Sequence, residues 1–354
     1  MRALLIAILV ATCACETTPA PVALTTPAAS ASTATASRIT YPGASPSLGH
    51  YAVMERAGIL DLVSVARVNV VASVDFTPAA FRPNDHMPYT SESSTRLYFL
   101  TAAAEVRSLT PDGRESPATS IQLTDIQEAG FAVSPDDRRI AVSIFSYTTN
   151  APDAAYLGMR LYVEDLAGGG NHVDIFTSPT LAEYPIGWVG GNLVVAVSAP
   201  HCCIGPDANP YGADSYHVVD PATGRRLASI CSSGAIPWGP VEPAGAMCGP
   251  QTFVRWTGAK FLPPAAVPDP GPYRAALSPD GTEVLVGGSP IRVLRGSADF
   301  RLDLNGFAMG WVDGVNVVIA TADNTYWMLD ARTGVGAQTT GETAYLGTLP
   351  VAIS

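Results

Sequence analysis

A short turn recurs along this chain, each time directly ahead of an apolar strand. Residues 278–281 read Ser-Pro-Asp-Gly and residues 134–136 read Ser-Pro-Asp, while Gly-Trp-Val-Asp-Gly at 310–314 and Gly-Trp-Val-Gly-Gly at 187–191 fill the same slot. Pro presets φ at the turn corner, Asp bonds its own backbone, and Gly accepts positive φ, so the pattern is typical of a tight hairpin. We assign structural roles in these turns to Ser134, Pro135, Asp136, Trp188, Ser278, Pro279, Asp280, Gly281, Trp311, Asp313 and Gly314.

A second turn follows aromatic strands. It reads Asp-Pro-Ala-Thr-Gly at residues 220–224 and Asp-Ala-Arg-Thr-Gly at 330–334, with a looser form at 165–169. Between the turns lie short β-branched or aromatic runs, and no long stretch has helical spacing, which predicts an all-β chain. One unit therefore reads strand, first turn, strand, connection, aromatic strand, second turn, strand.

A repeated four-strand unit predicts the blade of a β-propeller. The spacing of the turns fits blades of about 45 residues, so we expect six four-stranded antiparallel blades, with seven as the alternative. Ser134, Trp188, Ser278 and Trp311 should lie at equivalent positions, at the hairpin that joins the first two strands of a blade. Residues 51–73 are expected to supply a strand that closes the ring. The blades are expected near residues 74–130, 131–185, 186–237, 238–272, 273–305 and 306–354.

The Ser-Pro-Asp-Gly turn followed by an apolar strand resembles the propeller repeat of TolB-like periplasmic proteins. The Gly-His and Trp-Asp pairs of WD-type repeats are absent from the corresponding places. The resemblance implies a binding or scaffold role, because such propellers hold peptides, proteins or small ligands at the channel mouth or on blade loops. It transfers no functional residue, because the matching positions are structural turns.

The N-terminus predicts export. Met1 and Arg2 precede an apolar run of nine residues, Ala3 to Ala11, which matches a signal peptide and is too short to cross a bilayer. A Cys after such a run resembles the lipobox of bacterial lipoproteins, which implies a signal peptide at residues 1–12 and lipidation of Cys13. Cys15 is the alternative acceptor, and plain secretion is the alternative address. A Thr/Ala/Ser/Pro-rich tether through residue 50 and a propeller at 51–354 complete the domain prediction.

Four further cysteines, Cys202, Cys203, Cys231 and Cys248, predict two disulfides in an exported protein. Adjacent cysteines seldom bridge each other, because the small ring strains the peptide between them. We therefore expect Cys202 and Cys203 each to pair with one of the other two, pinning the long loop from about Ala199 to Ser215. The alternative is a zinc site that includes His201.

Composition and missing motifs narrow the function. The 20 Lys and Arg against 31 Asp and Glu give a net charge of −11, which argues against a general nucleic-acid binder. The sialidase Asp box and the hydrolase Gly-x-Ser-x-Gly elbow are missing from the sequence. We predict a non-enzymatic binding or scaffold protein without a cofactor, held outside the cell membrane by its lipid, with a protein, peptide or small molecule as partner. The alternative is an extracytoplasmic propeller enzyme, a lyase, hydrolase or quinoprotein-like oxidoreductase, with its site in the central funnel.

Overall fold

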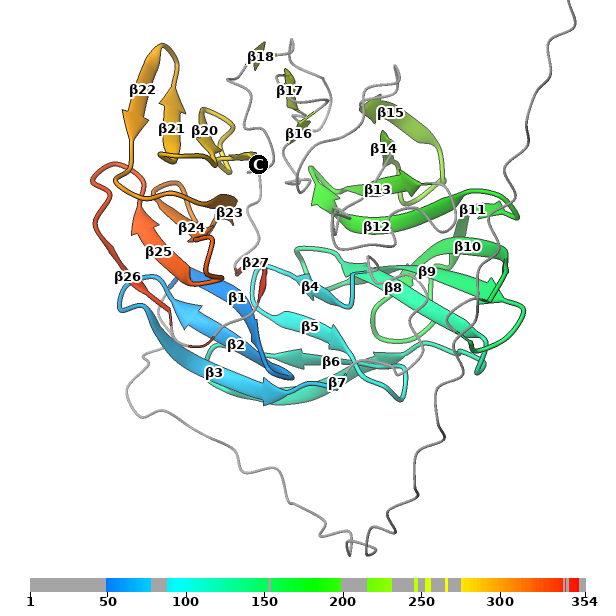
Figure 1. The fold of residues 1–354 in the computed structure, drawn as a ribbon. Coiled ribbons are helices and arrows are strands. Elements are labelled where there is room, and N and C mark those ends of the chain that lie inside the picture. Colours follow the sequence, from blue (N-terminus) through cyan, green and yellow to red (C-terminus); the bar gives the residue numbers. More distant parts are fainter. Residues whose placement is uncertain are drawn as a thin grey trace, which may run out of the picture. The chain divides into compact units, whose positions relative to one another are not determined.

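The computed structural model describes residues 49–77, 88–151, 154–198, 215–230, 245–247, 252–255, 265–266, 275–339, 341 and 344–349. The chain divides into two units, Met1–Ser37 and Arg38–Ser354, and every described residue lies in the second. All regular elements among the described residues are β-strands (Figure 1). Among these residues, no helix has the length and apolar character needed to pass through a bilayer.

The strands form seven antiparallel sheets, which we name blades 1 to 7. Blade 1 contains β27 (Ala344–Leu349), β1 (Tyr51–Arg56), β2 (Ile59–Ser64) and β3 (Asn69–Asp75). Blade 2 contains β4 (Thr90–Glu92), β5 (Leu97–Leu100), β6 (Glu105–Leu109) and β7 (Glu115–Ser120). Blade 3 contains β8 (Gln127–Val133), β9 (Arg139–Tyr147), β10 (Tyr156–Asp165) and β11 (Val173–Ser178).

The remaining four blades follow in chain order. Blade 4 contains β12 (Ala182–Val189), β13 (Asn192–Ser198), β14 (Ser215–Val219) and β15 (Arg226–Ile230), and blade 5 contains β16 (Gly245–Met247), β17 (Thr252–Arg255) and β18 (Ala265–Ala266). Blade 6 contains β19 (Ala275–Leu277), β20 (Glu283–Val286), β21 (Arg292–Arg295) and β22 (Ala298–Arg301). Blade 7 contains β23 (Phe307–Trp311), β24 (Asn316–Ala320), β25 (Tyr326–Asp330) and β26 (Gly336–Gln338).

The prediction of an all-β propeller with four-stranded antiparallel blades is confirmed. Six sheets have four strands, and the three described strands of blade 5 make a seventh sheet. Seven blades was the alternative to the expected six. Residues 51–73 were expected to supply one closing strand. Instead β1, β2 and β3 run from Tyr51 to Asp75 and form most of a blade of their own.

Blade 1 joins the two ends of the propeller chain. The C-terminal β27 pairs with β1, with Leu349 opposite Tyr51 and Ala344 opposite Glu55. Thr348 Oγ1 also donates a hydrogen bond to the Val312 carbonyl of blade 7 at 2.7 Å. Backbone pairing between the first and last strands therefore ties the end of the chain to its start.

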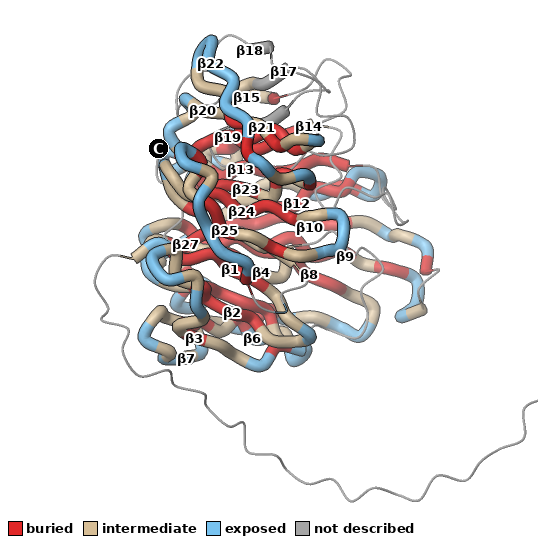
Figure 2. Tube along the Cα trace, turned by 60° about the vertical axis from the view of Figure 1, so that its left-hand side comes forward, coloured by how far each residue is buried: buried red, intermediate tan, exposed pale blue. Residues whose placement is uncertain are grey.

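The core lies between consecutive blades. Separate clusters of buried side chains join blades 1 and 2, 2 and 3, 3 and 4, 6 and 7, and 7 and 1. Val254 of β17 packs against the cluster of blades 3 and 4. A middle strand is therefore buried on both faces, which explains unbroken apolar runs such as that of β13. By contrast, the outer strand β22 is exposed along its whole length (Figure 2).

Candidate functional site

The two Ser-Pro-Asp turns have the same hydrogen-bonded geometry. Ser134 Oγ donates to Asp136 Oδ1 at 2.6 Å and accepts the Arg139 amide at 2.9 Å. Ser278 Oγ makes the corresponding contacts, to Asp280 Oδ1 at 2.6 Å and from the Glu283 amide at 2.9 Å. Both turns join the first two strands of a blade, so their polar groups serve the hairpin.

Trp188 and Trp311 occupy the same hairpin of blades 4 and 7, but one position earlier than Ser134 and Ser278 do in blades 3 and 6. Each tryptophan is the last or next-to-last residue of the first strand of its blade. Trp188 Nε1 donates to the Ala132 carbonyl of blade 3, and Trp311 Nε1 donates to the Ala276 carbonyl of blade 6. Both rings are buried. Each tryptophan therefore joins its blade to the preceding one. In the blade 7 turn, Asp313 Oδ1 accepts two backbone amides of the same hairpin, and Gly314 follows it.

Sequence reasoning missed two turns of the same chemistry. Thr110 Oγ1 donates to Asp112 and accepts the Arg114 amide at 3.2 Å, between the third and fourth strands of blade 2. Thr321 Oγ1 donates to Asp323 Oδ1 at 2.5 Å, between β24 and β25. The signal was present as Thr-Pro-Asp-Gly at residues 110–113. These two turns lie in later hairpins of their blades, so they do not share the spacing of the Ser-Pro-Asp turns.

The predicted lipidation and disulfide residues lie outside the described residues. They are Cys13, Cys15, Cys202, Cys203, Cys231 and Cys248, together with the zinc alternative His201. These assignments stay predictions. Within the described part of the chain, no group of three His, Cys, Asp or Glu side chains is arranged to hold a metal ion.

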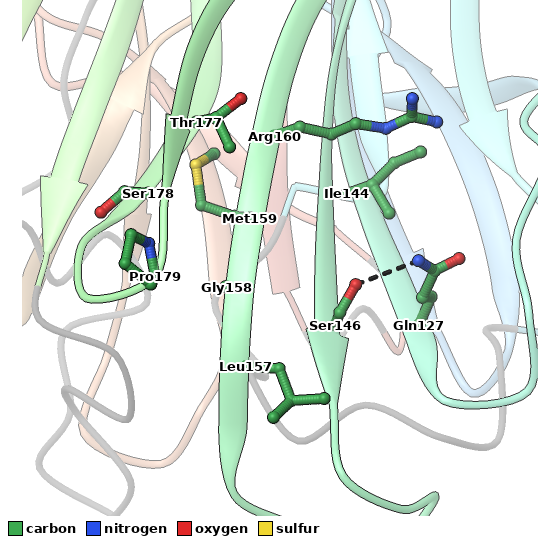
Figure 3. A pocket seen from close by; sticks show the side chains of 10 residues that line it. All are labelled: Gln127, Ile144, Ser146, Leu157, Gly158, Met159, Arg160, Thr177, Ser178 and Pro179. Atoms are coloured by element: carbon green, nitrogen blue, oxygen red, sulfur yellow. Dashed lines mark hydrogen bonds between the residues drawn. The ribbon is translucent and has the colours of Figure 1, made fainter.

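Blade 3 carries a pocket of about 340 Å³ that the sequence did not predict (Figure 3). It draws on all four strands of the blade, at the end where β9 passes to β10. We call this the pocket end, and we call the opposite end, with the hairpin 134–138, the turn end. The lining residues are Gln127, Ile144, Ser146, Leu157, Gly158, Met159, Arg160, Thr177, Ser178 and Pro179.

Strand register places the polar lining residues in two neighbouring rows. Gln127 and Gly158 both pair with Ser146, and the Gln127 amide donates to Ser146 Oγ at 3.0 Å. In the next row, Arg160 pairs with both Ile144 and Thr177. Because the rows lie two residues apart on each strand, their side chains project from one face of the sheet.

Gly158 opens the pocket between these side chains. Strand β10 bulges between Tyr156 and Gly158, and Gly158 has φ of 142°. A Cβ placed at residue 158 would come within 2.9 Å of the Ser178 carbonyl oxygen. The bulge therefore favours glycine at this position. Because Gly158 is the third member of the row of Gln127 and Ser146, that row carries only two side chains.

Arg160 begins a stacked series on the outer strands of blade 3. Its guanidinium carbon lies 5.3 Å from the centroid of the Tyr162 ring, which in turn stacks on His172 with centroids 4.8 Å apart. His172 lies between the carboxylates of Glu164, at 3.0 Å, and Asp174, at 3.2 Å. The hydrogen bond to Glu164 is the main cause that raises the pKa of His172, with Asp174 adding to it. Both carboxylates therefore contact the imidazole. Within the described part of the chain, Arg160 forms no ion pair with them or with any other carboxylate.

Exposed apolar side chains gather beside the pocket. Leu157 is 54% exposed and lines it, and Leu181 is 43% exposed just beyond Pro179. The Tyr156 hydroxyl donates to the Leu181 carbonyl at 2.7 Å, which holds the two segments together. Two of the four exposed large apolar side chains among the described residues therefore lie at this one place. A cluster of this kind at a concave site is typical of a binding surface.

Three buried carboxylates among the described residues lie outside the pocket: Asp61, Glu128 and Glu183. Glu128 Oε1 accepts the Tyr147 hydroxyl at 2.5 Å, and burial, followed by the charge of Glu128, raises the pKa of Tyr147. Glu183, 3% exposed, has its Oε1 atom 3.3 Å from His217 Nδ1 and 3.8 Å from Arg226 Nη2. His217 is itself buried against this carboxylate. Each of these two glutamates therefore has a polar or basic neighbour, which buried carboxylates need.

Comparison with known proteins identifies chains of similar fold. No protein-family model and no curated protein matches this sequence. The dihydro-heme d1 dehydrogenase NirN is 13% identical over 89% of this chain and 78% of its own, with a TM-score of 0.48. AztD from Citrobacter koseri is 10% identical over 84% of this chain and 81% of its own, with a TM-score of 0.45. BamB from Moraxella catarrhalis is 13% identical over 79% and 81%, with a TM-score of 0.40.

Proposed function

We propose that this protein is an exported, lipid-anchored propeller, similar to the TolB-like group, that binds a partner without converting it chemically. The pocket of blade 3 carries the proposal. It is concave and open, it combines apolar walls with hydrogen-bonding side chains, and two exposed leucines lie beside it. Such a composition suits recognition of a ligand.

The lining chemistry favours binding over catalysis. Acid–base catalysis relies on a carboxylate, an imidazole, a thiol or a similar group, and a serine or threonine hydroxyl acts as a nucleophile only when such a base activates it. None of the ten lining residues, all of them described, carries a carboxylate, an imidazole or a thiol. Gln127 and Ser146 instead bond to each other. This combination of an amide, hydroxyls and one guanidinium is suited to holding a polar group in place.

The extracytoplasmic address is part of the proposal and rests on the N-terminal sequence. The apolar run from Ala3 to Ala11 and the Cys13 that follows support cleavage and lipidation. Mass spectrometry of the protein purified from membranes tests this. We expect an N-terminal peptide that begins at Cys13 and carries an acyl modification. An unmodified N-terminus beyond Cys15 would show plain secretion instead.

Site-specific photo-crosslinking in the full chain tests the binding site. A photoreactive phenylalanine analogue is placed at Leu157, and in a matched chain at Val335, which is 72% exposed on blade 7. Both positions are exposed, so neither substitution should disturb folding. We expect a discrete crosslinked product from position 157 that position 335 does not give. Identical products from both positions, or none from position 157, would contradict a binding role for the pocket.

A further inference from the structure

The pocket of blade 3 combines one cation with an apolar wall, and this pairing specifies a ligand class. Resting on the binding function proposed above, we infer that the pocket takes the C-terminus of a polypeptide that ends in an apolar residue. The terminal carboxylate pairs with Arg160. The last side chain packs against Leu157 and Pro179, and the peptide amide groups face Gln127, Ser146 and Thr177.

Charge selects an anion. The chain as a whole carries a net charge of −11, yet the single charged residue that lines the pocket is Arg160. Its guanidinium forms no ion pair with any described residue and rests against the Tyr162 ring, with which it makes a cation–π contact. A guanidinium presents a planar fork of donors that matches a carboxylate. An anionic group entering the pocket therefore meets a cation that no described carboxylate pairs with.

The position of Arg160 relative to Leu157 limits the shape of the ligand. In Figure 3 the Arg160 side chain extends to the side of the pocket on which Ile144, Ser146 and Gln127 lie, while Leu157 lies at the lower end. In a polypeptide C-terminus the carboxylate and the final side chain leave the same Cα atom. A C-terminal residue can therefore present both groups within one pocket of about 340 Å³.

The hydrogen-bonding groups favour a peptide over a fatty acid, the other common source of a carboxylate on an apolar body. Gln127, Ser146 and Thr177 line the same face as Arg160. Gln127 Oε1 accepts the Thr124 amide and one Gln127 N–H donates to Ser146 Oγ, which leaves the second Gln127 N–H, the Ser146 O–H and the Thr177 hydroxyl without a bond to a described residue. An alkyl chain would cover these three groups and give them no hydrogen bond in return, which carries a free-energy cost. A peptide backbone offers N–H and C=O groups to all three. The missing side chain at Gly158 leaves space for that backbone beside Ser146.

The test compares two peptide pools on the full chain. Each pool has an acetylated N-terminus, a fluorescent label, random residues and a final leucine; one pool ends in a free carboxylate and the other in an amide. We expect the amide pool to bind about tenfold more weakly or worse, because a charge-assisted hydrogen bond is lost. On Arg160→Gln the two pools should bind equally. Arg332→Gln, a change at an exposed arginine of blade 7, should keep the wild-type ratio.

The outcomes separate the ligand class from the binding function. Equal binding of both pools to the wild type, or a ratio that persists in Arg160→Gln, overturns the assignment of a carboxylate to Arg160. Binding of octanoate that depends on Arg160, without binding of the peptide pools, overturns the peptide in favour of a fatty acid. In each case a photo-crosslink specific to position 157 would still support the binding function. Absence of that crosslink would contradict the binding function as well.

Discussion

The two ends of blade 3 use their polar groups in opposite ways. At the turn end, the Asp137 carboxylate accepts hydrogen bonds from Thr95 Oγ1 at 2.6 Å and from the Tyr98 hydroxyl at 2.9 Å, both in blade 2. Arg139 donates to the Pro221 carbonyl of blade 4 at 2.8 Å. Each of these side chains therefore joins blade 3 to a neighbouring blade.

At the pocket end, the polar side chains make no bond to a neighbouring blade among the described residues. Gln127 and Ser146 bond to each other within blade 3, Arg160 makes no ion pair with a described residue, and Leu157 is exposed. The same sheet thus holds the propeller together at one end and presents a recognition surface at the other. The comparison implies that substitutions at the turn end reduce stability, whereas exposed substitutions at the pocket end reduce binding.

Trp188→Ala should produce the largest loss of stability. The buried ring packs between blades 3 and 4, and Nε1 satisfies the Ala132 carbonyl. Removing it leaves a cavity and an unpaired carbonyl, so we expect the free energy of unfolding to fall by about 3–5 kcal/mol. Denaturant titration of the full chain measures this. Trp311→Ala has the same geometry and should cost a similar amount, and a change in either variant below about 1 kcal/mol would contradict the blade-joining role.

Gly158→Ala should have an intermediate effect and act at the pocket end. The added methyl meets the Ser178 carbonyl oxygen, and φ of 142° is strained for alanine. We expect a loss of about 1–3 kcal/mol in the free energy of unfolding. Leu157→Ser, at an exposed position of the same pocket, serves as the control and should stay within about 0.5 kcal/mol of wild type. Equal stability of Gly158→Ala and wild type would show that the bulge tolerates a side chain.

Tyr98→Phe should have a smaller effect at the turn end. It removes the hydroxyl that bonds to Asp137 while keeping the buried ring. Loss of one hydrogen bond to a carboxylate should lower the free energy of unfolding by about 1–2 kcal/mol. The same denaturant titration measures it. A stabilised variant would mean that the cost of burying the hydroxyl outweighs its hydrogen bond.

His172 should give the smallest effect, visible as a dependence on pH. Its pKa is raised above the ordinary value of 6.5, mainly by the hydrogen bond to Glu164. The protonated imidazole therefore stabilises the fold fully below the unfolded pKa, and this contribution disappears as pH rises through the folded pKa. Wild type should exceed His172→Gln in stability at about pH 5.5 by more than at about pH 8.5. A difference that grows with pH would contradict the ion pairs. Because the side chain is 40% exposed, the effect should also weaken with added salt.

Local patterns were enough to predict the blade but not the pocket. The turns at Ser134 and Ser278 are specified by residues within five positions of each other, so their geometry follows from short-range chemistry. Trp188 and Trp311 lie in the predicted hairpin, but one residue before the position equivalent to Ser134 and Ser278. The sequence left six and seven blades as alternatives for two reasons. Blade 5 has the weakest turn pattern, and blade 1 takes one strand, β27, from the far end of the chain.

The β-strands, the hairpin turns and the repeat that makes a propeller follow from the order of residues along the chain, because each depends on residues adjacent in it. The tertiary structure decided the pocket. Gln127, Ser146 and Gly158 come from three strands and share a row only through the register of β8, β9 and β10. Arg160 is one arginine among many until that register sets it beside Ile144 and Thr177. A shift of one residue in strand pairing would turn these side chains to the opposite face, and neither composition nor motif contains that information.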